Sequence, residues 1–323
     1  MNPRFAGQGH VPAAGTDRAR AAHFARRAPC FFPISGVQWL YQTPARPCGP
    51  AQGPFLPFPG KKEVKRLRIR YISADPAGNR TAFVLTPVAP ELRAALAARM
   101  MALCPEGFEQ VGFTCPESLL APLPRLDMMG GEFCGNASRA FALLAAARRG
   151  RGETELAISV SGAKGPVHVR LDPARGTAYA HMPLPTALET VCARGQTIPV
   201  VRMEGIAHAI VTDNAPSADA AQAVLHAMPL SDAQGVLFVK GAHVTPLVHV
   251  PATGTSVWES SCGSGSVALA WYLARKRADG EHAFSFDEPG GRLNVRVLMR
   301  GGNAVRAVMG GSVTLGEERE ITL

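Results

Sequence analysis

The stretch Glu132-Phe133-Cys134-Gly135-Asn136-Ala137-Ser138 suggests the fold, because a similar stretch appears in the second half of the chain. That stretch is Ser260-Ser261-Cys262-Gly263-Ser264-Gly265-Ser266. In both, a cysteine precedes small residues, and an alanine-rich apolar segment follows at 140–145 or 267–271. Gly, Asn and Ser tolerate the backbone angles of a helix start, whereas Ala and Leu favour the helix interior. The sequence therefore predicts one cysteine at the N-terminus of each of two helices.

Each predicted helix start offers unpaired backbone N–H groups and the positive end of the helix dipole. Both features bind anions and lower the pKa of a thiol. If the two starts face each other, a carboxylate between them accepts N–H bonds from Gly135 and Asn136 on one side. Gly263 and Ser264 donate from the other side. Donors in comparable oxyanion sites are worth about 3–4 kcal/mol each at the transition state.

Two opposed thiols permit proton exchange at the carbon next to the bound carboxylate. One cysteine removes the α-proton as a thiolate, and the other, as a thiol, returns a proton to the opposite face. Cys134 and Cys262 are the candidate catalytic residues, and the predicted reaction is racemisation or epimerisation of an α-amino acid without a cofactor. A single Cys-Gly motif would indicate an inert buried cysteine. A structural disulfide between the two cysteines is the alternative interpretation of the pair.

Length and composition agree with a two-domain globular protein. The chain has 323 residues, of which 46% are apolar and 18% charged. It contains no apolar run of about 18 residues, which a membrane span requires, and no secretory signal is visible. Its seven cysteines are irregularly spaced and form no C-x-x-C motif, so neither a disulfide framework nor a zinc site is predicted. We expect a cytoplasmic protein that binds neither membrane nor metal.

The net charge of +9 is concentrated in one part of the chain. Residues 1–62 contain eight basic residues and one acidic residue, so the remainder is nearly neutral. This distribution weakens a general argument for nucleic-acid binding. A non-enzymatic protein that binds nucleic acid through this tail is the alternative of a different class. It predicts a salt-sensitive association that is lost when residues 1–62 are removed.

The predicted fold class is α+β with two similar lobes, because the order of strands and helices roughly repeats after Pro183-Leu184-Pro185. We expect residues 1–62 to form a disordered or loosely attached basic tail. Residues 63–185 are expected to form the N-terminal lobe with the Cys134 helix, and 186–300 the C-terminal lobe with the Cys262 helix. Residues 301–323 are a terminal segment that could cross back to the N-terminal lobe.

From about Val64 onward the chain resembles the diaminopimelate epimerase-fold superfamily, whose members carry such a pair of cysteine motifs. Within it, the chain is most similar to the cofactor-independent histidine racemases of opine-type (staphylopine-like) metallophore biosynthesis. The closer similarity rests on Gly78-Asn79, Glu109-Gln110-Val111-Gly112-Phe113, Glu132-Phe133-Cys134-Gly135-Asn136-Ala137, Trp258-Glu259-Ser260-Ser261-Cys262-Gly263-Ser264-Gly265 and Pro289-Gly290-Gly291. The resemblance implies that each lobe is a curved, mostly antiparallel sheet around a central helix, with the active site in the cleft between the lobes.

Diaminopimelate epimerase itself differs at two places. It has Asn-Pro-His where this chain has Ile206-Ala207-His208, and a Glu-Arg pair where this chain has Ala252-Thr253-Gly254-Thr255. Residues that would bind the second amino-acid head of diaminopimelate are therefore missing, and diaminopimelate is not the expected substrate. We interpret His208 as a core or surface histidine rather than a metal ligand.

The resemblance also implies roles for substrate-binding residues. Asn79 and Asn136 would contact the α-carboxylate or the α-amine, and Glu259 would pair with the α-ammonium. Glu109, with Gln110 beside it, would accept a hydrogen bond from an imidazole N–H. Either glutamate could instead be a surface or helix-capping charge.

The predicted reaction is the conversion of L-histidine to D-histidine. A free amino acid is the only small-molecule partner that we expect. A homodimer is compatible with the sequence. Two other isomerases compete with this prediction. One is a racemase or epimerase of a different amino acid that uses the same site. The other is a superfamily isomerase of a non-amino-acid substrate; such members often lack one or both cysteines, and this chain has both.

Overall fold

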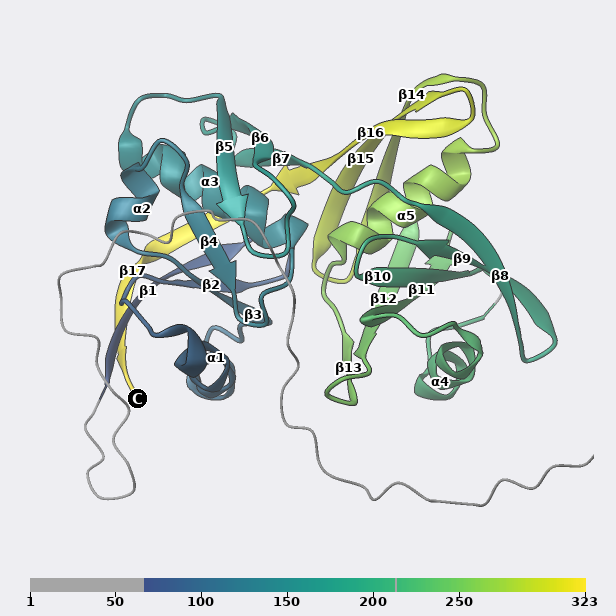
Figure 1. Cartoon of the computed structure of the whole chain (residues 1–323), viewed down its shortest axis with the longest axis horizontal. Coiled ribbons are helices and arrows are strands. Elements are labelled where there is room, and N and C mark those ends of the chain that lie inside the picture. Colours follow the sequence, from purple (N-terminus) through teal and green to yellow (C-terminus); the bar gives the residue numbers. More distant parts are fainter. Residues whose placement is uncertain (1–66, 213) are drawn as a thin grey trace, which may run out of the picture. The chain divides into compact units, whose positions relative to one another are not determined.

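Two helices that begin directly after cysteines lie at the centres of two lobes (Figure 1). They are α3 (Gly135–Arg149) in the N-terminal lobe and α5 (Gly263–Ala274) in the C-terminal lobe. The computed structural model describes residues 67–212 and 214–323. The tail predicted for residues 1–62 lies outside this part of the chain. The predicted α+β fold and both cysteine helices are confirmed.

The other elements complete each lobe. The N-terminal lobe contains β1 (Arg68–Asp75), β2 (Thr81–Val84), α1 (Pro90–Leu103), β3 (Gln110–Phe113), α2 (Pro116–Leu120), β4 (Arg125–Met128), β5 (Glu155–Val160), β6 (Val167–Asp172) and β7 (Thr177–His181). The C-terminal lobe contains β8 (Ala187–Ala193), β9 (Gln196–Arg202), β10 (Ile206–Val211), α4 (Ala218–Ala227), β11 (Ala233–Lys240), β12 (His243–Val250), β13 (Thr255–Trp258), β14 (Gly280–Glu288), β15 (Gly291–Arg300) and β16 (Asn303–Ser312). The last strand is β17 (Thr314–Thr322).

Most strands pair with antiparallel neighbours. In the N-terminal lobe β1 pairs with β2, β3 with β4, and β5 with β6 and then β7, whereas β2–β3 and β4–β5 are parallel. In the C-terminal lobe β8, β9 and β10 are antiparallel, β10 and β11 are parallel, and β11, β12 and β13 are antiparallel. Strands β14, β15 and β16 form a second antiparallel group. These strands surround the two central helices.

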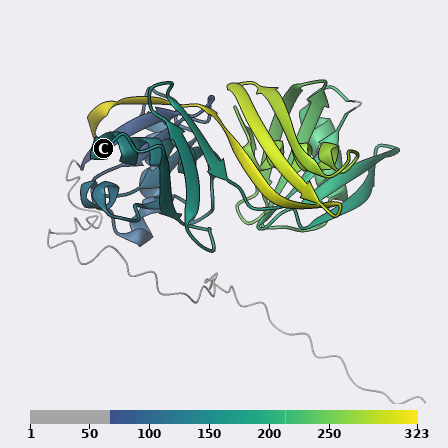
Figure 2. The ribbon, with the colours of Figure 1, turned by 90° about the horizontal axis from the view of Figure 1, so that it is seen from above.

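The chain passes between the lobes twice. Residues 182–186 connect β7 to β8, and we propose 185/186 as the boundary between the lobes. The return is made by β16 and β17, drawn in yellow in Figure 2. Strand β16 pairs with β15 in the C-terminal lobe and with β7 in the N-terminal lobe, and β17 then pairs with β1. These pairings tie the two lobes together through the backbone.

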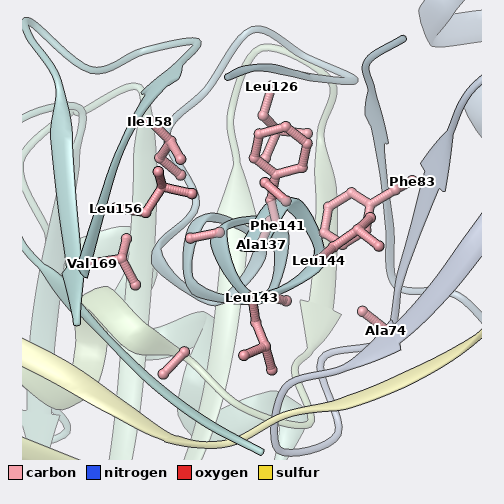
Figure 3. Close-up of a cluster of buried hydrophobic side chains, with 14 of the residues drawn as sticks. Ala74, Phe83, Leu126, Ala137, Phe141, Leu143, Leu144, Leu156, Ile158 and Val169 are labelled. Carbon is pink, nitrogen blue, oxygen red and sulfur yellow. The ribbon is translucent and has the colours of Figure 1, made fainter. Parts of the chain in front are cut away.

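Helix α3 is enclosed by its lobe. Its residues from Gly135 to Ala146 are all buried, as expected for a helix in the centre of a core. Figure 3 shows Phe83, Leu126, Ile158 and other apolar side chains around it. Gly150, with φ of 65°, ends the helix in the left-handed conformation that glycine adopts without strain.

Helix α5 has the same position in the C-terminal lobe, where Val267, Leu269 and Trp271 pack among β9, β10 and β14–β16. Helices α1 and α4 instead pack on one side only, α1 against β3 and α4 against β8 and β11. In the described ranges no helix has the length and apolar character that crossing a membrane requires. The two cysteine helices thus have corresponding central positions in the two lobes.

Candidate active site

Cys134 and Cys262 are the N-cap residues of α3 and α5. Both have extended backbone angles, with φ and ψ of −126° and 117° at Cys134 and −120° and 101° at Cys262. The Cys134 sulfur accepts a hydrogen bond from the Ala137 N–H at 3.4 Å. Both side chains are free thiols. The predicted placement of one thiol at each helix start is therefore correct.

The two helix starts lie against each other. A Cβ atom added to Gly135 would be 2.6 Å from the Met182 sulfur and 2.9 Å from the Met309 methyl carbon. A Cβ added to Gly263 would be 2.5 Å from the same Met309 carbon. The Asn136 amide nitrogen also donates to the Ser261 hydroxyl at 3.0 Å, across the two lobes. Glycine after each cysteine leaves room for the ends of Met182 and Met309, which lie against the two helix starts.

The side chains predicted to bind substrate on the Cys134 side form one network. The Asn79 amide nitrogen donates to Glu109 Oε2 at 2.7 Å, and Asn79 Oδ1 lies 3.9 Å from the Cys134 sulfur. The Gln110 amide donates to that same Asn79 oxygen and to the Thr81 hydroxyl. The structure thus brings Asn79, Glu109 and Gln110 together beside the first thiol.

Glu109 reaches beyond its own lobe. Its second carboxylate oxygen, Oε1, accepts the Ser260 N–H at 3.3 Å, two residues before Cys262. The carboxylate therefore bridges the Cys134 network and the approach to the second thiol. The Asn136 side chain is not open to a ligand, because the residue is 1% exposed and its amide nitrogen is bound to Ser261.

A half-buried carboxyl group, Glu259, and a buried one, Glu288, flank Cys262. Burial raises the pKa of Glu259 to about 7, and a hydrogen bond with the Cys262 thiol acts in the opposite direction. Burial also raises the pKa of Glu288, to about 8. Glu288 accepts the Cys262 N–H at 2.5 Å and a hydrogen bond from the Ser266 hydroxyl, so it holds the start of α5. Sequence reasoning found Glu259 but missed Glu288, because it lies 26 residues further along than Cys262, at the end of β14.

Ser264 and His208 complete the surroundings of the second thiol. The Ser264 hydroxyl is 3.6 Å from the Cys262 sulfur and 2.9 Å from His208 Nε2. Complete burial lowers the pKa of His208 to about 3, so the imidazole is neutral at physiological pH. His208 is a core histidine, as the sequence indicated, but one that orients a hydroxyl next to Cys262.

The expected lowering of the thiol pKa is wrong for both cysteines. Burial raises the pKa of Cys134 to about 11, and burial likewise raises that of Cys262 well above its usual range. The N–H groups of Ala137 and Gly265 do lower the two values, but by less than burial raises them. Nearby carboxylates, above all Glu259, raise them further. Both thiols are therefore protonated at neutral pH.

Glu259→Gln is expected to lower the pKa of the Cys262 thiol, because it removes a neighbouring negative charge. The measurement is the pH dependence of iodoacetamide alkylation of Cys262, followed by peptide mass spectrometry in a Cys134→Ser background. Glu132→Gln is the matched control, since Glu132 raises the pKa of Cys134 and is not among the groups acting on Cys262. An unchanged or higher midpoint in Glu259→Gln would contradict the prediction.

Glu288→Gln is expected to make the protein more stable above pH 7 and to have little effect near pH 5. The folded-state pKa of about 8 lies above the ordinary value, so ionisation destabilises the fold as pH rises through the range from about 5 to 8. Within that range the free energy of unfolding falls by up to about 1.4 kcal/mol for each step of one in pH. Glutamine can accept the Cys262 N–H with its oxygen and donate its amide N–H to the Ser266 hydroxyl oxygen. Melting temperatures at pH 5, 6, 7 and 8 test this, with the exposed Glu317→Gln as control. A gain in the melting temperature that did not grow with pH would rule it out.

An open pocket of about 420 Å³ adjoins Glu259. Its lining residues all belong to the C-terminal lobe: Pro216, Ser217, Ala218, Thr245, Trp258, Glu259, Ser260 and Pro289. Trp258 is 42% exposed and packs on Phe238 with ring centroids 5.9 Å apart, which leaves part of the indole open to a ligand. The pocket therefore combines an aromatic surface with a half-buried carboxyl group.

Solved structures share this fold at low sequence identity. A PhzF-family protein from Enterococcus faecalis has a TM-score of 0.55 and 16% identity over 80% of this chain and all of that chain. A probable proline racemase from Agrobacterium radiobacter, solved with bound carbonate, has a TM-score of 0.54 and 17% identity over 77% of this chain and 92% of that chain. Both show that the fold is of the diaminopimelate epimerase type.

Comparison with other protein sequences identifies the family more specifically than comparison of folds does. A histidine racemase of Fusobacterium nucleatum is 33% identical over 181 residues, which are 52% of this chain and 66% of that protein. A histidine racemase of Staphylococcus aureus is 23% identical over 255 residues, covering 72% of this chain and 89% of that protein. The chain thus spans slightly less than two thirds of the Fusobacterium protein. The family model described as the histidine racemase CntK N-terminal domain matches residues 68–319. Since this match covers nearly all of the described chain, the protein belongs to the histidine racemase CntK N-terminal domain family.

Proposed function

We propose that the protein interconverts L- and D-histidine by a cofactor-independent two-base mechanism, with Cys134 and Cys262 as the bases. The observation that carries the proposal is the pair of thiol N-caps on α3 and α5, whose helix starts share contacts with Met182 and Met309. A substrate carboxylate at these starts would accept backbone N–H groups from both helices. The α-carbon would then lie between the two thiols.

The thiolate forms, in this proposal, when substrate binds. Both thiols have raised pKa values, and four carboxyl groups lie near them: Glu109, Glu132, Glu259 and Glu288. An α-ammonium group that enters this acidic surrounding adds a positive charge, which lowers the pKa of a neighbouring thiol. Glu259, with a pKa of about 7 and a hydrogen bond to the Cys262 thiol, is suited to accept that thiol's proton.

One thiolate then removes the α-proton, and the charge that develops moves onto the carboxylate held by the helix N-termini. The thiol on the opposite face supplies a proton, which gives the mirror-image amino acid. We place the imidazole in the pocket beside Trp258, where the ring can stack and Glu259 or Thr245 can accept its N–H. Glu109, the position predicted for that contact, is instead bound to Asn79 and the Ser260 N–H.

The test is proton NMR of L-histidine incubated with the reduced protein in D₂O, combined with chiral chromatography. Loss of the α-proton signal together with formation of D-histidine supports the proposal. A panel of other amino acids is run in parallel, and exchange with one of these alone would move the assignment to that substrate. No exchange with any amino acid would refute racemase activity and favour the tail-binding alternative.

Three further properties of the protein are also proposals. We propose a cytoplasmic site of action, because the reaction requires reduced thiols. The supply of D-histidine to metallophore biosynthesis and the formation of a homodimer stay predictions of the sequence resemblance.

A further inference from the structure

Arg139 is the largest side chain that is fully buried in the described chain, and it lies one turn beyond Cys134 on α3. Its Nε donates to Asn136 Oδ1 at 3.1 Å. Its Nη1 donates to the backbone oxygens of Gly311 and Ser312 at 3.1 and 2.8 Å. The remaining nitrogen, Nη2, is buried and has no hydrogen-bond partner among the described residues. Arginine is rarely buried so completely, and this one lies directly under the first helix start.

The contact with Asn136 fixes the direction of its amide group. Because Asn136 Oδ1 accepts the arginine N–H, the amide nitrogen is turned toward the other lobe. There it donates to the Ser261 hydroxyl at 3.0 Å and to the Ser261 carbonyl at 3.3 Å. Ser261 is 1% exposed and directly precedes Cys262. A chain of three side chains thus connects the helix that carries one thiol to the residue next to the other thiol.

The contacts with Gly311 and Ser312 add the strand that crosses between the lobes. These residues end β16, which pairs with both β15 and β7, immediately before β17 begins. The guanidinium therefore joins three segments: the start of α3, the crossing strand and, through Asn136, the start of α5. A planar group with donors in fixed directions suits this geometry, whereas lysine has a single ammonium group.

No carboxylate of the described residues pairs directly with Arg139, and the negative charge of Asp75 acts on it only at longer range. No ion pair of Arg139 occurs in the described ranges, and its hydrogen-bond acceptors are neutral oxygens. Burial lowers its pKa to about 10, so it is still a cation at neutral pH, and a negative charge on Cys134 would favour this cation. Such a buried cation is costly to maintain for stability alone. A role in the site accounts for it better.

We propose that Arg139 is a positioning residue that, through Asn136 and Ser261, holds the two thiol-bearing helix starts in the alignment that two-base proton transfer requires. This inference rests on the proposed function. Without this link the second thiol is misplaced. The carbanion that forms when the first thiolate removes the α-proton then persists longer before the second thiol protonates it. During that time the first thiol exchanges its proton with solvent and returns a deuteron to the same face.

The experiment compares two products at low conversion of L-histidine in D₂O. One is D-histidine, and the other is L-histidine that has gained an α-deuterium. For Arg139→Lys and Arg139→Gln we expect the ratio of the first product to the second to fall at least about tenfold, in line with the sensitivity of proton transfer to geometry. A loss of folded protein alone lowers both products equally and leaves the ratio unchanged. A wild-type ratio in these variants would overturn the proposal.

Arg149→Met is the matched control, because Arg149 lies on the same helix, is largely buried and also donates to backbone oxygens, those of Leu119 and Ala121. Its loss is expected to lower stability without changing the ratio; a ratio that fell as far as in the Arg139 variants would overturn the proposal.

Ser261→Ala, which removes only the hydroxyl acceptor, is the milder test if the Arg139 variants do not fold. We expect a smaller fall of the ratio in the same direction, and an unchanged ratio would count against the proposal.

A second experiment does not depend on racemase activity. If wild-type protein exchanges no amino acid, the proposed function fails, and the coupling is then decided by melting temperatures of Arg139→Gln, Ser261→Ala and the double variant. We expect the double variant to lose less than the sum of the two single losses, because each change releases the same link. Additive losses would show that Arg139 and Ser261 are independent and would overturn the proposal.

Discussion

In D₂O, Cys134→Ser and Cys262→Ser are each expected to lose histidine racemisation by a factor of at least about 10³, yet each should still exchange the α-proton of one enantiomer. Serine is a far weaker acid and base than cysteine, so the variant keeps a working base on one face only. The remaining thiol can remove a proton and return a deuteron to that same face. The two variants should therefore retain exchange for opposite enantiomers.

Separate incubations of L- and D-histidine, with deuterium measured by mass spectrometry after chiral separation, test this. Cys192→Ser is the control, because Cys192 is exposed on β8, away from both helix starts, and full activity is expected. The enantiomer that each variant exchanges assigns that face to the remaining thiol. Racemisation that survives in either variant, or exchange of the same enantiomer by both, would disprove the two-base mechanism.

Gly290→Ala is expected to lower kcat/KM by about 10²-fold or more, the scale of effect that a displacement of about 1 Å produces in a catalytic site. Gly290 lies in the turn between β14 and β15, and its backbone touches that of Gly78 in the other lobe. A Cβ added to Gly290 would be 2.5 Å from Gly78 Cα and 2.7 Å from the Ala77 oxygen. Backbone atoms cannot rotate out of the way, so the lobes must move apart.

The displacement occurs directly beside residues that surround the two thiols. Gly290 donates its N–H to the Ser260 carbonyl at 2.8 Å, and Gly78 precedes Asn79 of the Cys134 network. Gly165→Ala is the matched control, since a Cβ there would meet nothing within 4 Å. Steady-state kinetics of both variants, with melting temperatures to verify folding, give the comparison. Wild-type kcat/KM in Gly290→Ala would mean that close contact of the lobes is not needed for activity.

Local sequence was a good guide to the elements that position the site. The Cys-Gly motifs and the alanine-rich segments predicted both central helices, because caps and helix propensities depend on neighbouring residues. Some strands give no comparable local signal. Strand β13 is exposed along its whole length and β8 is mostly half-exposed, so neither shows the alternation by which strands are recognised.

The sequence identified those site residues that lie within a motif. It did not identify residues that reach the thiols only through the folding of distant segments. Asn79, Glu109 and Glu259 lie in the motifs that carry the family resemblance, and the structure groups them around the thiols. Glu288 has no such signal and reaches Cys262 only because β14 ends beside α5. Arg139 has none either, because an arginine on a helix usually marks an exposed face, whereas this side chain is completely buried.

Two cysteines at the starts of two central helices in an α+β fold could be predicted without a structure, because the signals for caps and helices are local. How the thiols ionise and what holds them together depends instead on tertiary packing. Burial is a property of the whole fold, and it outweighs the helix N-terminus in setting the pKa of Cys134 and Cys262. The contacts that join the lobes, from Arg139 through Asn136 to Ser261 and from Gly78 to Gly290, link residues more than a hundred positions apart. Such contacts arise only when the whole chain has folded.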